Sequence, residues 1–142
     1  MALILSLTGC STTPDRSGVV GTWVNEGPRA KEAVLVFSGD GTVRACGLPS
    51  PLIQSAFADV LDWDRRIGLL GAWTFEGSRV YLDIDRVLLR GLPTAGISGT
   101  YLYVSGPSSS PELTVALGDP DEGRRFAFHR TGNRRCDPDD SD

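Results

Sequence analysis

The sequence predicts an all-β protein: an eight-stranded antiparallel up-and-down barrel, or a flattened sandwich, with one short helix. Seventeen Gly and nine Pro among 142 residues leave little room for long helices and favour short strands joined by turns. The pattern Gly-x-Trp occurs twice, at 21–23 and 71–73, and each copy leads into or forms a predicted hairpin. Eight strands in hairpin order must either close or stack to protect their edges, and we favour closure into a barrel.

The individual strands are expected where β-branched and aromatic runs are bounded by Gly, Pro and Asp. An Asp-Gly turn at 40–41 joins the second and third of them. Alternation is cleanest at 79–85, where Val80, Leu82 and Ile84 share one face. The predicted strands cover residues 20–25, 33–37, 42–46, 69–76, 79–85, 100–105, 112–117 and 124–130.

The one helix is expected over residues 51–62, lying across an end or a side of the sheet. Ser50 can cap it, and Pro51 suits the first helical position. Trp63 is expected to complete the apolar face of this helix. The other apolar residues recur at helical spacing: Leu52, Ile53, Ala56, Phe57, Val60 and Leu61. Residues 86–99 carry no clear pattern.

The net charge of −4 belongs to the end of the chain. Four of the 18 acidic residues are aspartates within the last six positions, so 14 acidic and 14 basic residues remain elsewhere. The arginines are scattered, without the clustered basic surface of a nucleic-acid-binding protein. We therefore expect no nucleic-acid partner.

The amino terminus begins with an apolar run, residues 1–7, followed by Leu7-Thr8-Gly9-Cys10. The run is shorter than the roughly 20 residues that span a bilayer. It is similar to the end of a signal peptide, and the four residues resemble the lipobox of bacterial lipoproteins. That resemblance implies lipidation of Cys10 and a membrane-anchored, extracytoplasmic protein. The chain then divides into a signal-peptide remnant (1–9), a flexible tether (10–18), the β-barrel domain (19–131) and an acidic tail (132–142).

Gly21-Thr22-Trp23 on the first strand is similar to the Gly-x-Trp signature of the lipocalins. In that family an arginine of the last strand packs on the tryptophan at the closed end of the barrel, and Arg130 matches this position. The resemblance implies an apolar cavity and a small hydrophobic ligand. The alternative is an envelope interaction module whose core is filled and whose outer face docks on a partner.

Chemistry beyond binding finds little support in the sequence. His129 is the single histidine, so a histidine triad or a multi-histidine metal site cannot form within one chain. Asp83 and Asp85 share one strand face but have arginines nearby, which favours surface ion pairs over acid–base catalysis. We predict no catalytic residues, no metal and no cofactor. Tyr81, Tyr101 and Tyr103 oppose the aliphatic faces of their strands and are the predicted ligand-binding residues.

The two cysteines other than Cys10, Cys46 and Cys136, form an even pair. In a protein that folds outside the cytoplasm, such a pair is expected to form a disulfide. The alternative keeps Cys46 as a small buried residue and Cys136 as a free thiol.

Overall fold

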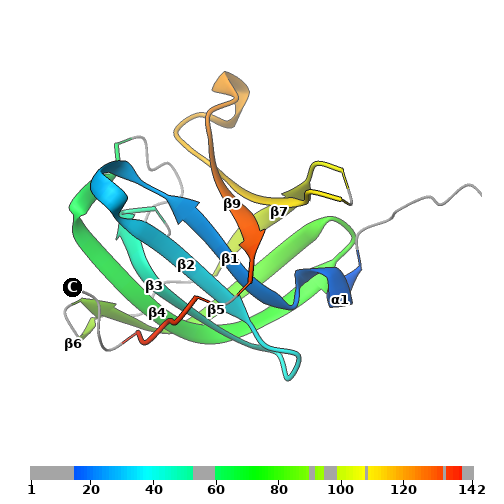
Figure 1. Cartoon of the computed structure of the whole chain (residues 1–142), viewed down its shortest axis with the longest axis horizontal. Coiled ribbons are helices and arrows are strands. Elements are labelled where there is room, and N and C mark those ends of the chain that lie inside the picture. Colours follow the sequence, from blue (N-terminus) through cyan, green and yellow to red (C-terminus); the bar gives the residue numbers. More distant parts are fainter. Residues whose placement is uncertain are drawn as a thin grey trace, which may run out of the picture.

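Eight strands form the barrel in the computed structural model, which describes residues 15–52, 60–89, 92–94, 99–107, 109–132 and 134–138 (Figure 1). The barrel strands are β1 (Gly21–Glu26), β2 (Glu32–Phe37), β3 (Thr42–Ser50), β4 (Asp62–Glu76), β5 (Arg79–Leu89), β7 (Thr100–Ser105), β8 (Glu112–Ala116) and β9 (Arg125–Thr131). A ninth, short strand, β6 (Leu92–Thr94), pairs only with the end of β5.

The sheet closes on itself. Each barrel strand pairs antiparallel with the strand before it, apart from β6, and β9 returns to pair with β1. Trp23 on β1 lies opposite Arg130 on β9 at this seam. The structure thus confirms the closed up-and-down barrel and excludes the flattened sandwich.

Three strands are several residues longer than the sequence predicts, and irregular pairing explains each of these differences. β3 runs to Ser50 and β4 begins at Asp62, with register shifts at two places between them. β5 runs to Leu89, past a shift opposite Leu70 and Gly71. A bulge adds one residue to one strand and reverses the inward and outward alternation beyond it. The period-two pattern that predicts a strand is therefore lost in these extensions.

The predicted helix over 51–62 is wrong at its end. Asp62 pairs with Ser50 in the sheet, and Trp63, expected on the helix, belongs to β4. Pro51 and Leu52 form a turn, and residues 53–59 lie outside the described residues. Two of the described helices are short 3₁₀ turns, η1 (Pro28–Ala30) and η2 (Pro120–Glu122). Among the described helices none is long and apolar enough to cross a membrane.

The described α-helix is α1 (Arg16–Val19), and its first three residues lie within the range 10–18 that was expected to be a tether. Asp15 caps it by accepting a hydrogen bond of 2.9 Å from the Gly18 amide. Hydrogen bonds from the Ser17 hydroxyl and the Gly18 amide hold the pKa of Asp15 below its usual value. Val19 is buried, and its carbonyl accepts a 2.9 Å hydrogen bond from the Trp23 indole. The chain is thus attached to the barrel before β1 begins.

Candidate functional site

Side chains of the described residues fill much of the barrel interior. A side chain lining an internal cavity wide enough for water would keep accessible surface there. Eleven core side chains have none at all: Trp23, Ala33, Leu35, Ala45, Leu48, Leu69, Val80, Leu82, Leu102, Leu113 and Phe128. They come from all eight barrel strands. Aromatic rings reinforce this packing: the Phe37 and Trp73 rings meet edge to face, with their centroids 5.3 Å apart.

One end of the barrel carries an arginine over a buried tryptophan. The Arg130 guanidinium carbon lies 5.5 Å from the centroid of the Trp23 ring, and an Arg130 nitrogen donates to the Val20 carbonyl. Gly21 makes room for this group. A Cβ on Gly21 would lie 3.3 Å from Arg130, and Gly21 has φ of +135°, which other residues rarely adopt. The structure thus places the predicted pair in contact and supplies a physical reason for the Gly-x-Trp spacing.

The second Gly-x-Trp tryptophan has an arginine of its own. The Arg16 guanidinium carbon of α1 lies 4.5 Å from the Trp73 centroid, and Arg16 donates to the Gly39 carbonyl at 3.1 Å. Trp73 donates its indole N–H to the Ser38 carbonyl at 3.0 Å. These contacts close the same end of the barrel with α1 and the β2–β3 turn (Figure 1).

The three predicted ligand-binding tyrosines lie together, but on the outer surface of β5 and β7. We call this patch, together with Arg79, the tyrosine face. Tyr81 and Tyr101 are direct cross-strand partners with ring centroids 5.0 Å apart. Arg79 is the partner of Tyr103, and its guanidinium carbon lies 5.0 Å from the Tyr101 centroid. Tyr101 is 40% exposed and Tyr103 45% exposed. The tyrosines cannot line a space inside the barrel, because the residues between them, such as Leu102, point into the core.

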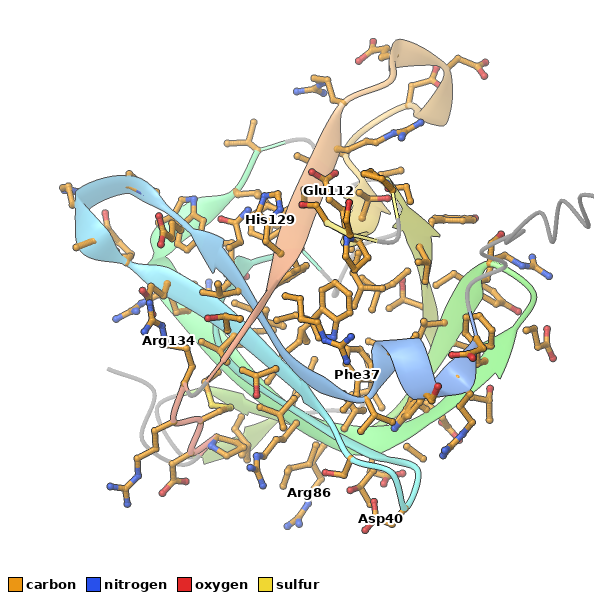
Figure 2. All side chains as sticks on the ribbon, turned by 45° about the vertical axis from the view of Figure 1, so that its right-hand side comes forward. Phe37, Asp40, Arg86, Glu112, His129 and Arg134 are labelled. Atoms are coloured by element: carbon orange, nitrogen blue, oxygen red, sulfur yellow. A yellow bond between two sulfur atoms is a disulfide. The ribbon has the colours of Figure 1, made fainter. Side chains whose placement is uncertain are left out.

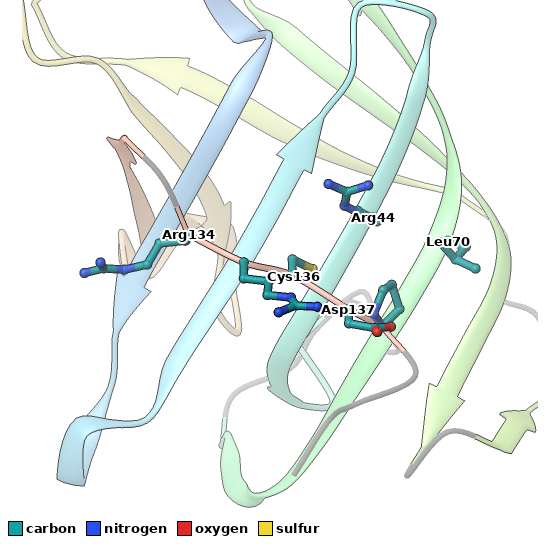
Figure 3. Close-up of a pocket in the computed structure, with 7 residues that line it drawn as sticks. Arg44, Leu70, Arg134, Cys136 and Asp137 are labelled. Carbon is teal, nitrogen blue, oxygen red and sulfur yellow. The ribbon is translucent and has the colours of Figure 1, made fainter.

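Residues 134–138, which we call the C-terminal segment, cross the outside of the sheet (Figure 3). The sulfur atoms of Cys136 and Cys46 lie at disulfide distance, with Cα atoms 5.6 Å apart, as the sequence predicts. Cys136 is buried against Val24 and Val34 on the outer faces of β1 and β2. The alternative of a free Cys136 is therefore wrong.

Two more contacts hold the C-terminal segment in place. Arg134 forms an ion pair of 3.3 Å with Glu32 on β2. Pro138 packs directly on Gly68 of β4, where a Cβ would lie 2.7 Å from the Pro138 carbonyl oxygen. With the disulfide, these contacts attach both ends and the middle of the segment to the barrel.

A surface pocket of about 490 Å³ lies beside this crossing. Arg44 on β3 and Leu70 on β4 form its floor, and the C-terminal segment forms its wall (Figure 3). Sequence reasoning missed this pocket, because nothing in the spacing of Arg44, Arg134 and Arg135 indicates that they line one surface pocket. The predicted disulfide was the signal that could have found it.

The other polar candidates form ordinary surface contacts. His129 is exposed beside Glu112, with its Nδ1 3.6 Å from a carboxylate oxygen (Figure 2). Asp64 accepts from Lys31 at 2.5 Å and from Arg29 at 3.3 Å. Arg79 pairs with Glu76 at 3.9 Å. Over the described ranges, no three acidic, histidine or cysteine side chains gather as metal ligands would.

Cys10, the predicted lipidation site, lies outside the described residues. Comparisons with models of protein families, with curated proteins and with solved structures find no match to this chain. The functional argument therefore rests on the tyrosine face, the packed interior and the lipobox resemblance.

Proposed function

We propose that this protein is a lipid-anchored binding module of the bacterial cell envelope, without enzymatic activity, which docks on a partner through the tyrosine face. The observation that carries the proposal is the placement of the aromatic side chains. One group packs in the core of the barrel, and the tyrosines of the tyrosine face lie on its outer surface. A carrier of small hydrophobic molecules needs roughly 300 Å³ or more of enclosed apolar space. The eleven core side chains without accessible surface favour the module over the carrier.

The composition of the tyrosine face suits a docking surface. Tyr and Arg are enriched among the residues that dominate the binding energy of protein interfaces. Tyr buries a large area with only two rotatable side-chain bonds. Tyr101 and Tyr103 belong to β7, which is paired with a strand on each side. The backbone of β7 is therefore already ordered, and binding would cost little backbone entropy. Arg79 is already positioned by Tyr101, which limits the side-chain entropy that docking would cost. The expected partner is another envelope protein.

Photo-crosslinking tests the docking surface in the native envelope. A photoreactive residue at Tyr103 should give one discrete crosslinked product, and Tyr101→Ser should reduce its yield about tenfold or more, as expected for an interface hot spot. Val60, which is 80% exposed, provides the matched control position and should give no such product. Equal crosslinking from both positions would contradict the assignment of this face.

Lipidation of Cys10 tests the anchor. Expressed with the natural upstream region, the protein should partition into detergent and carry added acyl mass, and Cys10→Ser should abolish both. Finding the unmodified mass in the soluble fraction would remove the envelope part of the proposal. Extraction of an apolar small molecule at one equivalent per barrel would favour the carrier instead.

A further inference from the structure

The arginine-lined pocket beside the C-terminal segment has the geometry of an anion site. Arg44 lies two residues before Cys46 on the same outer face of β3, about 7 Å along the strand. Arg135 directly precedes Cys136, whose Cα is 5.6 Å from that of Cys46. The two arginines therefore approach the disulfide from different parts of the chain, and both line the pocket.

The charge balance of the pocket is positive. Three arginines and one carboxylate, Asp137, are among the seven residues that line it. Arg134 is directed away from Arg44 and is neutralised by Glu32 (Figure 3). Arg44 and Arg135 form no ion pair with any residue in the described ranges. Arg86 adds a further positive charge nearby, because it lies across the sheet from Leu70, the residue opposite Arg44.

We propose that this pocket binds a phosphate group, carried by a small solute or by a lipid headgroup. The planar guanidinium fork donates two parallel hydrogen bonds to phosphate oxygens, and two forks from different elements can hold one phosphate between them. Leu70 on the floor and Pro138 on the wall provide apolar surface for the group that carries the phosphate. The pocket is separate from the tyrosine face, so this site is independent of the docking function.

The disulfide assembles the site. Without the Cys46–Cys136 bond, the segment that carries Arg135 is held by non-covalent contacts, among them the Arg134–Glu32 ion pair and the packing of Pro138 on Gly68. Binding should therefore depend on oxidation of this pair. Such dependence distinguishes a built pocket from nonspecific attraction of anions to exposed arginines, which would survive reduction.

Titration with inorganic phosphate at constant ionic strength tests the proposal, using the full chain with Cys10→Ser and following the arginine side-chain signals by NMR. Saturable shifts at Arg44 and Arg135 are expected, and Arg44→Gln and Arg135→Gln should each weaken binding about tenfold. Arg125→Gln, an exposed arginine on β9, is the control and should leave binding unchanged. Non-saturable shifts, or equal weakening by all three variants, would overturn the proposal.

Two further variants test whether phosphate binds at this site. The Cys46→Ser, Cys136→Ser variant, shown to be folded by its near-ultraviolet spectrum, should lose phosphate binding. A chain ending at Pro138 should bind at least as tightly, because three aspartates that follow Pro138 are removed. Weaker binding by that chain, or undiminished binding without the disulfide, would contradict the site.

Glycerol phosphate and vesicles containing phosphatidylglycerol distinguish the two sources. Arg44-dependent binding of either one supports the proposal and identifies the source. Failure of inorganic phosphate, glycerol phosphate and vesicles alike would overturn it.

Discussion

The guanidinium carbon of Arg130 lies 5.5 Å from the centroid of the Trp23 ring, at the seam where the last strand pairs with the first. Trp23 is fully buried, and Arg130 covers the end of the barrel above it. The same contact depends on Gly21, since a side chain there would meet the arginine. The Arg130–Trp23 contact therefore links Gly21, Trp23 and Arg130, which the Gly-x-Trp resemblance had already associated in the sequence.

Replacing Arg130 should weaken the barrel modestly. Arg130→Met keeps the apolar stem but removes the charge over the indole and the hydrogen bond to Val20, and we expect a loss of about 0.5 to 1 kcal/mol in the free energy of unfolding. Urea denaturation measures it. Arg125→Met on the same strand is the control, and an equal loss there would show that the effect is not specific to Trp23.

Gly68→Ala should strain the crossing of the C-terminal segment. The added methyl would lie 2.7 Å from the Pro138 carbonyl oxygen, and overpacking of this kind costs about 1 to 3 kcal/mol. Gly39→Ala, whose Cβ would meet nothing within 4 Å, should be close to neutral. Without the disulfide the segment can move aside, so the cost of Gly68→Ala should then shrink. A cost unchanged in that background would place the strain elsewhere.

Reducing Cys46–Cys136 should destabilise the protein by up to about 4 to 5 kcal/mol, because the bond closes a loop of 90 residues in the unfolded chain. Unfolding with and without reductant measures the loss. The double serine variant should show no response to reductant. Two alkylatable thiols in the unreduced protein would contradict the bond.

The contacts of Asp64 should make the free energy of unfolding depend on pH in the acidic range. The hydrogen bond from Lys31, then the charges of Lys31 and Arg29, hold the pKa of Asp64 below its usual value. Its stabilising contribution is therefore full above the unfolded-state pKa and is lost as the pH falls through the lower folded-state pKa.

The measurement compares wild type with Asp64→Asn across pH. The difference in unfolding free energy should be constant above about pH 5 and should shrink below about pH 4. Asp83→Asn is the control, because Asp83 lies exposed on β5 and forms no ion pair with a described residue. A difference that persists unchanged at low pH would exclude the Lys31 interaction as its cause.

The sequence predicted the parts of the fold where pairing is regular. β1, β2, β7, β8 and β9 lie within a residue or so of their predicted bounds, and their pairings carry no register shift. The ends of β3 and β5 and the start of β4 were missed, because register shifts break the alternation there. α1 was missed because its four residues include a single buried apolar side chain, Val19.

The candidate site residues likewise divide into those that the sequence could predict and those that it could not. The cysteine pair could be predicted because only two cysteines remained once Cys10 was assigned. The clustering of the three tyrosines follows from strand alternation plus the Tyr81–Tyr101 register, and only the second of these required the structure. Arg16 over Trp73 could not be predicted, since a residue in an expected tether has no register to place it.

The seam between β1 and β9 also constrains when this protein can fold. Its hydrogen bonds join residues as far apart as Val20 and Arg130, 110 positions along the chain. Loop-closure entropy for such contacts must be overcome before they contribute, so domains with this topology fold slowly. A ribosome releases residues 125–131 only after all the residues before them have been made. β1 therefore keeps one edge unpaired until β9 has left the ribosome, and the barrel can close only from then on.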